Sequence, residues 1–228
     1  MTVLAIITAR GGSKGIKNKN IKKLNGKPLI SYIFNSAKKV RLIEDIILST
    51  DSLKIAKIGK KIGINVPFIR PKKLATDKSL QAETVIHAVK KYESISKKKF
   101  DTIVLLQPTC PLTKPKHINN AIKLITKKKY LSVGSYTILK DGHPTFHLIK
   151  KKNNIKLANP NFKGINSRHN LKKLFRACGN VYAIRKNELF KLKSFISKKH
   201  NYTFIEEECA VNINDHNDWF IADALVKR

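Results

Sequence analysis

The sequence has few acidic residues, few cysteines and no long apolar run, and each shortage excludes a class of protein. Its 228 residues include three cysteines without a C-x-x-C pair, so neither a disulfide framework nor a thiolate zinc site is expected. No stretch approaches the roughly 18 consecutive apolar residues of a membrane span. No basic region precedes the first apolar run as it would in a secretory signal. We therefore expect a folded cytoplasmic protein without a membrane partner.

Acidic residues number 15 against 47 basic ones, which gives a formal net charge of +32. Such a charge can mark a nucleic-acid-binding surface. However, the basic residues are 40 lysines and seven arginines, and the lysine runs carry no interleaved aromatic residues that could stack on bases. This composition favours a solvated, lysine-rich surface, makes a nucleic-acid partner unlikely and still attracts anionic substrates.

Hydrophobic patterning alternates between strands and helices along the chain. Short continuous apolar runs indicate buried strands, and apolar residues at helical spacing indicate covering helices. The expected strands are 3–7, 45–50, 66–70, 102–106, 131–139 and 179–185, with a strand end near Ala210. The expected helices are 28–39, a segment capped by Asp51 and Ser52, 82–95, a segment starting at Pro115 and one around Trp219. This alternation predicts an α/β fold with a mostly parallel sheet wrapped by helices.

Residues 140–176 break this alternation, because they are polar, rich in Asn and Lys, and weakly periodic. They suit a small excursion from the main sheet. No internal repeat is evident, and 228 residues are enough to bury one large core. A single domain over residues 1–228 with this excursion is therefore expected.

The stretch from Val3 to Asn20 joins the first expected strand to a glycine-rich loop. Three glycines and four basic residues lie in this loop: Gly11, Gly12, Gly15, Arg10, Lys14, Lys17 and Lys19. Glycines let backbone N–H groups approach a ligand closely, and the cations attract phosphate. Neither G-x-G-x-x-G nor G-x-x-x-x-G-K-[ST] occurs, so the dinucleotide and Walker motifs are excluded. Taken alone, the stretch leaves a phosphate site and a purely structural turn as alternatives.

Four segments of the chain, taken in order and spacing, resemble the acylneuraminate cytidylyltransferases, which include the CMP-sialic, CMP-legionaminic and CMP-pseudaminic acid synthetases. These segments read ITARGGSKGIKNKNIKKLNGKPLI, STDS, FIRPKKLATD and LLQPTCPL. The resemblance implies a Rossmann-like fold, with helices on both faces of the sheet and the excursion at 140–176 used for homodimerisation. It also implies transfer of CMP from CTP to the anomeric hydroxyl of a nonulosonic acid, with release of pyrophosphate and with Mg²⁺ as cofactor.

The same resemblance implies roles for residues of the first segment, of the third segment and of the loop that follows the third. Arg10 and Lys19 are the catalytic candidates, expected to contact the triphosphate and stabilise the departing pyrophosphate. The nucleotide-binding candidates are Gly11, Gly12, Ser13, Lys14, Asn20, Arg70, Ser79 and Gln81. By this resemblance the loop backbone cradles the phosphates, Arg70 lies against the cytidine, and the loop from Ala75 to Gln81 borders the base and ribose.

The resemblance implies three sugar-binding candidates. Gln107 follows the strand expected at 102–106, where ligand-binding loops of α/β proteins lie. Arg168 stands in RHNLK, where the family usually reads R-Q-D-L-P, and Tyr182 stands in CGNVY, where it reads N-G-A-I-Y. The structural alternatives are that Gln107 only caps a strand end and that Arg70 is a surface charge before a proline.

The chain departs from the family at the expected metal site, which usually reads D-I-D followed three residues later by another acid. Here the residues are Asn212, Ile213 and Asn214, then Asp215 and Asp218. Asparagine can bind a hard cation through its amide oxygen but lacks the charge that makes Mg²⁺ binding strong. Three possibilities stay open: weaker binding at Asn212 and Asn214, metal held chiefly by the substrate phosphates with help from Asp215 or Asp218, or lost activity.

Two other functions compete with the leading one. CMP-Kdo synthetase shares the fold and the chemistry, although RGGSKGIKNKN and LLQPTCPL look closer to the sialic-acid branch. A catalytically inactive, basic binding protein of the same fold would explain both the net charge and the Asn-for-Asp exchanges. The sequence leaves open which nonulosonic acid is the substrate.

Overall fold

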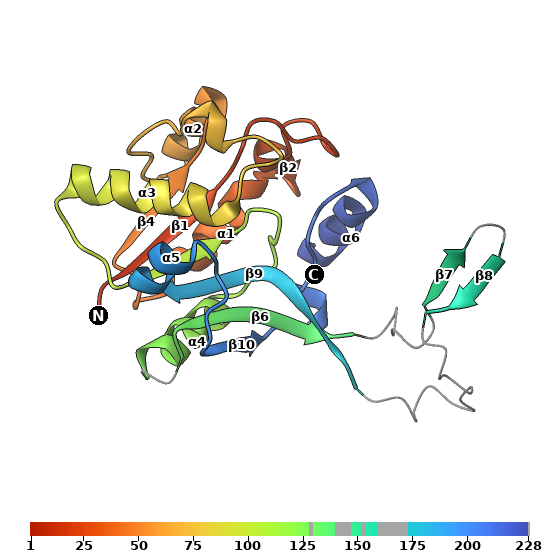
Figure 1. The fold of residues 1–228 in the computed structure, drawn as a ribbon. Helices are drawn as coiled ribbons and strands as arrows, with labels where there is room; N and C mark the ends of the chain where they lie inside the picture. The colour runs from red at the N-terminus through yellow and green to blue at the C-terminus, as the bar shows by residue number, and fades with distance from the viewer. Residues whose placement is uncertain (128–129, 140–146, 152–153, 159–172, 228) are drawn as a thin grey trace.

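A six-stranded sheet forms the centre of the protein (Figure 1). The computed structural model describes residues 1–127, 130–139, 147–151, 154–158 and 173–227. The strand order is β10-β6-β9-β5-β1-β4. The strands are β1 (Val3–Thr8), β4 (Asp45–Ser49), β5 (Thr102–Leu106), β6 (Ser132–Ile138), β9 (Phe175–Arg185) and β10 (His200–Phe204). Strand β1 runs parallel to β4 and β5, and β10 parallel to β6, whereas β9 lies antiparallel between β5 and β6.

Helices cover both faces of this sheet, and alternate residues of β1 show why. Val3, Ala5 and Ile7 point to one core cluster, and Leu4 and Ile6 point to the other, as expected when successive strand residues face opposite sides. The first cluster packs against α1 (Leu29–Lys38), α2 (Leu53–Lys61) and α4 (Pro115–Thr126), and the second against α3 (Gln81–Ser96) and α5 (Lys186–Leu192). The predicted α/β fold with a mostly parallel, two-sided sheet is confirmed.

Local signals explain where several helices begin and end. The Ser52 hydroxyl accepts a hydrogen bond from the backbone N–H of Ile55 and caps α2 as predicted. Gly63 follows that helix with a φ of +86°, a conformation that glycine adopts without strain. The last helix, α6 (His216–Val226), is capped by Asp215. None of these helices, nor any other in the described residues, is long and apolar enough to cross a membrane.

Two local predictions were wrong, and several short elements were not predicted. Residues 66–70 do not form a strand: Ile69 makes one isolated bridge to Thr50, which follows β4, and Pro67 has no N–H to donate to a ladder. A 3₁₀ turn, Glu207–Cys209, replaces the strand end expected near Ala210. Sequence reasoning also missed α5 and β10, whose patterns are short and partly polar, and the small hairpin of β2 (Lys23–Leu24) and β3 (Lys27–Pro28).

The expected excursion contains a second antiparallel hairpin, formed by β7 (Leu148–Lys151) and β8 (Asn154–Leu157). Figure 1 shows this hairpin apart from the main sheet. Residues 175 and 176, which we assigned to the excursion, already belong to β9. The single-domain assignment and the role of the excursion in dimerisation stay predictions.

Candidate functional site

A cavity of ≈ 470 Å³ opens at the carboxyl ends of β1 and β5. Its lining comes from the glycine-rich loop, the segment 70–84, the loop after β5 and the segment before α6. The lining residues are Thr8, Arg10, Ser13, Lys14, Gly15, Lys19, Asn20, Arg70, Leu74, Ala75, Thr76, Asp77, Ser79, Gln81, Thr84, Gln107, Pro108, Thr109 and Asn214. Most of the predicted site residues, from four separate stretches of sequence, therefore share one cavity.

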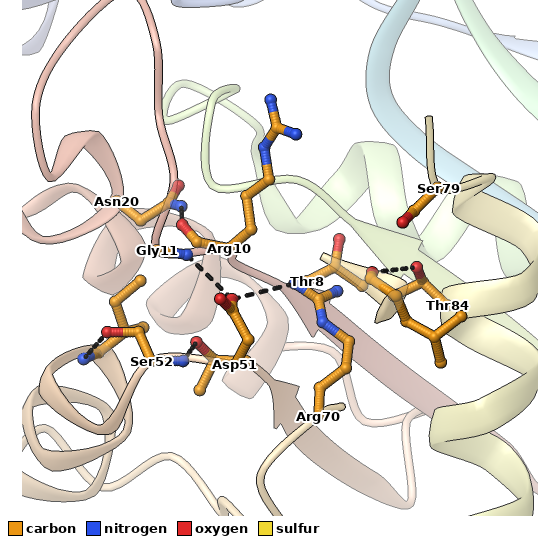
Figure 2. Close-up of polar contacts among 12 residues, drawn as sticks. Thr8, Arg10, Gly11, Asn20, Asp51, Ser52, Arg70, Ser79 and Thr84 are labelled. Carbon is orange, nitrogen blue, oxygen red and sulfur yellow. Dashed lines mark hydrogen bonds and ion pairs between the residues drawn. The ribbon is translucent and has the colours of Figure 1, made fainter. Parts of the chain in front are cut away.

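The glycine-rich loop is held by hydrogen bonds to its own backbone and to Asp51. The buried Asn20 amide donates to the carbonyl oxygen of Arg10 at 3.0 Å. The backbone N–H of Gly11 donates to the Asp51 carboxylate at 2.9 Å (Figure 2). Asn20 thus shapes the loop through Arg10, and the Gly11 N–H is already engaged in this conformation rather than free for a phosphate.

Asp51 also faces Arg70, which is 4% exposed (Figure 2). One guanidinium nitrogen, Nη2, lies 3.6 Å from the Asp51 carboxylate. Burial lowers the pKa of Arg70, and the charge of Asp51 opposes that shift. A buried cation needs such a partner. Asp51 therefore joins the glycine-rich loop to Arg70, a role that sequence reasoning missed although STDS was among the matching segments.

Arg10 and Lys14 extend from the loop to a single carboxylate across the cavity. Arg10 Nη1 lies 2.7 Å from Asp77 Oδ1, and Lys14 Nζ lies 2.6 Å from Asp77 Oδ2. Hydrogen bonds from Lys14 and Arg10 lower the pKa of Asp77. Asp77 lies within the predicted 75–81 loop, but sequence reasoning did not single it out.

Lys19 takes a different direction and connects the loop to the other end of the chain. Its Nζ donates to the carbonyl oxygen of Ile213 at 2.7 Å. Burial, and then the nearby charge of Arg10, lower the pKa of Lys19, while Asp218 and Asp215 oppose this shift. Lys19 thus lies beside both the cavity and the expected metal segment.

The loop before α3 carries its own hydrogen bonds. The Ser79 hydroxyl accepts from the N–H of Thr76 and donates to the carbonyl of Lys73, and Thr84 donates to the carbonyl of Leu74. Gln81 donates to the Thr8 hydroxyl at the end of β1 at 2.6 Å. Ser79 and Gln81 therefore line the cavity from a segment tied to α3.

The sugar-binding candidates are placed differently from one another. Gln107 lines the cavity at the end of β5. Tyr182 does not: its ring packs against Phe195 on the side of α3 and α5, with centroids 5.7 Å apart. Arg168 lies outside the described residues. Sequence reasoning placed all three at one subsite, and the described cavity contains Gln107 alone of them.

The two carboxylates of the segment 212–218, Asp215 and Asp218, do not line the cavity. Asp215 and Asp218 accept each other's backbone N–H groups in a capping box at the start of α6, and Asp218 also accepts from the N–H of Asn214. The side-chain oxygen of Asn212 is buried without a partner, and Asn212 does not line the cavity. Of residues 212–218, Asn214 alone lines the cavity, so this segment brings a neutral amide to the cavity beside the Lys19 ammonium, and a neutral amide does not fit a charged Mg²⁺ site.

One other cluster in the described part of the chain brings metal-binding residue types together, namely His117, Glu206 and Cys209. His117 Nδ1 accepts from the N–H of Lys114, and Nε2 lies 2.5 Å from a Glu206 oxygen. Both ring nitrogens are thus engaged, and Lys116 pairs with Glu206 as well. This cluster connects α4 to the segment after β10 and is structural.

Comparisons with known proteins show the family to which this chain belongs. The family described as Cytidylyltransferase has a model that matches residues 4–217. The CMP-N,N'-diacetyllegionaminic acid synthase of Legionella pneumophila is 31% identical over 232 residues, which cover 100% of this chain and 97% of that protein. The enzyme of the same name from Campylobacter jejuni is 29% identical over 98% of this chain and 94% of its own length.

A solved structure of CMP:2-keto-3-deoxy-manno-octonic acid synthetase complexed with CTP shares the fold. Its TM-score is 0.73 at 12% identity, and the match covers 100% of this chain and 99% of that one. The predicted enzyme class, a CTP-dependent nucleotidyltransferase, is confirmed by the family match and these relatives. With nearly all of its length matched and three of its four motifs lining one cavity, the chain belongs to the cytidylyltransferase family.

Proposed function

We propose that this protein transfers CMP from CTP to the anomeric hydroxyl of a sialic-acid-like nonulosonic acid and releases pyrophosphate. The observation that carries the proposal is the charge of the cavity. Four basic side chains, Arg10, Lys14, Lys19 and Arg70, line it, against one acidic side chain, Asp77. A triphosphate is the part of CTP that such a lining attracts.

In the reaction, a sugar hydroxyl oxygen attacks the α-phosphorus of CTP in line with the departing group. The new bond joins that oxygen to phosphorus, the bond from the α-phosphorus to the bridging oxygen breaks, and the hydroxyl proton is released. Negative charge develops on the pyrophosphate, and in this proposal Arg10, Lys14 and Lys19, which line the cavity, neutralise it. Catalysis then rests on positioning and charge stabilisation.

The remaining site residues position the two substrates in this proposal. Gly12 and Ser13 supply loop backbone to the phosphates, and Arg70 with the segment 74–81 borders the cytidine. Gln107 faces the sugar from the end of β5. Arg168 and Tyr182 stay sugar-binding proposals that rest on the family resemblance, because the described cavity does not include them.

Mg²⁺ belongs to this proposal only as the counter-ion that accompanies CTP, because the segment 212–218 brings only the neutral Asn214 amide to the cavity lining. Homodimerisation through the 140–176 excursion and a cytoplasmic location are further parts of the proposal. They follow from the family resemblance and from the sequence, respectively.

The direct test measures pyrophosphate release by the purified protein with CTP, Mg²⁺ and either N-acetylneuraminic, legionaminic or pseudaminic acid. We expect release with at least one acid and its loss in Arg10→Ala. Arg41→Ala is the matched control, because Arg41 is exposed and lies outside the cavity lining. No release with any of the three acids would refute the proposal, and release with Kdo alone would assign the protein as a CMP-Kdo synthetase.

The inactive-protein alternative makes a different prediction in the same assays. It expects no turnover with any sugar, together with nucleic-acid binding that collapses as salt rises. Titration of CTP with and without Mg²⁺ separates the enzyme proposal from the inactive-protein alternative. The enzyme proposal requires CTP binding, and the alternative does not.

A further inference from the structure

The cavity contains an anion of its own. Among the described residues that line it, Asp77 is the one acidic side chain. Its two carboxylate oxygens are divided between two cations of the glycine-rich loop: Oδ1 lies 2.7 Å from Arg10, and Oδ2 lies 2.6 Å from Lys14. A phosphate group offers the same kind of charged oxygen to the same donors. Asp77 therefore takes the position, with respect to these cations, that a phosphate would take.

Hydrogen bonds that do not involve Asp77 hold the segment that carries it. The Ser79 hydroxyl closes a turn with Thr76 and Lys73, and Thr84 secures Leu74 to α3. In the part of the chain that the structure describes, Asp77 alone joins residues 72–80 to Arg10 and Lys14. Breaking these two ion pairs would leave the turn intact and separate it from the glycine-rich loop.

The two ion pairs of Asp77 are exposed enough for another anion to replace its carboxylate. The side chains are 36% exposed in Arg10, 80% in Lys14 and 46% in Asp77, and ion pairs at such exposure contribute little because water competes for both partners. A triphosphate carries several charges where Asp77 carries one, so it replaces the carboxylate readily.

We infer that Asp77 is an internal competitor of the nucleotide's phosphates: it occupies Arg10 and Lys14 in the empty site, and an incoming triphosphate displaces it and frees the turn that Ser79 closes with Thr76 and Lys73. The inference rests on the proposed function, because it takes Arg10 and Lys14 as phosphate-binding residues. The same contact delays binding of weaker anions, since each must first displace Asp77.

The test is titration of inorganic tripolyphosphate, and separately of cytidine, into wild type and Asp77→Asn by calorimetry. We expect Asp77→Asn to bind tripolyphosphate about two- to tenfold more tightly, as loss of two exposed pairs allows, and to bind cytidine with unchanged affinity. Asp77→Glu keeps the charge and should stay near wild type. Glu44→Gln is the charge-matched control, because Glu44 pairs with Lys98 at the amino end of β4, away from the cavity.

A Lys14→Gln background separates displacement of a contact from a general change of charge. If Asp77 acts through its ion pairs, Asp77→Asn has a smaller effect in this background, because one of its two partners is gone. An equal effect in both backgrounds, or no tightening in Asp77→Asn, overturns the inference. Pyrophosphate release by the wild type is scored separately, so enzyme activity without tightening rejects only the Asp77 inference, and tightening without activity rejects only the proposed reaction.

Discussion

Lys19 and Ile213, far apart in the sequence, are joined by a 2.7 Å hydrogen bond from the lysine ammonium to the backbone carbonyl. The bond connects the glycine-rich loop to the segment before α6. Ile16 and Ile213 strengthen this connection, because both lie in one buried cluster with Trp219. The two ends of the chain thus build one wall of the cavity.

Replacing Lys19 should cost activity more than stability. We expect Lys19→Met to lower kcat for pyrophosphate release by about 10²–10³, the usual cost of removing a charged group that stabilises a transition state. Lys23→Met is the control, because Lys23 is exposed and outside the cavity lining. Retention of more than half the activity in Lys19→Met would contradict the role given to this residue.

The lowered pKa of Lys19 also predicts that catalytic activity depends on pH. Burial and Arg10 lower its pKa below the ordinary value of 10.5, and the charged form is the one that stabilises pyrophosphate. Activity should therefore fall as pH rises through this lowered pKa, at a pH below 10.5. Lys19→Arg keeps its charge in this range and should move the alkaline decline upward in a pH profile of kcat/KM.

Gly15 is required by close packing against the C-terminal segment. A Cβ at this position would lie 2.4 Å from the Asn214 carbonyl oxygen, whereas a Cβ at Gly12 would meet nothing within 4 Å. We expect Gly15→Ala to destabilise the protein by about 1–3 kcal/mol through overpacking, and Gly12→Ala to leave the melting temperature nearly unchanged. Equal melting temperatures for the two variants would show that the segment at Asn214 can move to accommodate the added methyl group without loss of stability, and would contradict this prediction.

Asp51 should be needed for stability because Arg70 is buried beside it. Asp51→Asn leaves this cation without a charged partner, and we expect a loss of about 3 kcal/mol in the free energy of unfolding. The double variant Asp51→Asn with Arg70→Met removes the cation as well and should recover part of that loss. Denaturant unfolding measures both, and a double variant less stable than Asp51→Asn alone would contradict the pairing.

Because asparagines stand at positions 212 and 214 of the expected metal site, we expect the protein without nucleotide to bind divalent ions weakly. Converting Asn212 and Asn214 together to Asp should raise Mn²⁺ affinity at least about tenfold, since carboxylates are the preferred ligands of hard cations. Asn217→Asp in the exposed first turn of α6 adds charge nearby and should not do so. Spin-resonance titration of Mn²⁺ gives the result, and tight binding by the wild type would refute the prediction.

Glu206 predicts acid sensitivity at the structural cluster. The hydrogen bond from Lys116 is the main cause that lowers its pKa from 4.5 to about 2. A lowered carboxylate pKa gives stability that is present above pH 4.5 and lost as pH falls toward 2. The stability difference between wild type and Glu206→Gln should therefore shrink over this interval in thermal melts, and a constant difference would contradict it.

Much of the fold could be read from local patterns. The buried runs 3–7 and 102–106 form strands because nearly every residue in them is apolar, and Pro115 begins a helix as its fixed φ favours. Strand β10, HNYTF, was not predicted because its sequence is partly polar. Its polar residues are accommodated because β10 lies at the edge of the sheet beside β6. Pairing with a neighbour, rather than its own pattern, makes it a strand.

The candidate site, like the fold, was predicted from the sequence only in part. Glycines and cations at short spacing made a phosphate site one of two interpretations of this loop, and the family resemblance then gave Arg10, Lys14 and Lys19 as phosphate-binding candidates. Neither could show that Asp77 holds two of these cations or that Ile213 holds the third. Composition and period are properties of neighbouring residues, whereas an ion pair or hydrogen bond depends on which distant segments the folded sheet brings within about 3 Å of each other.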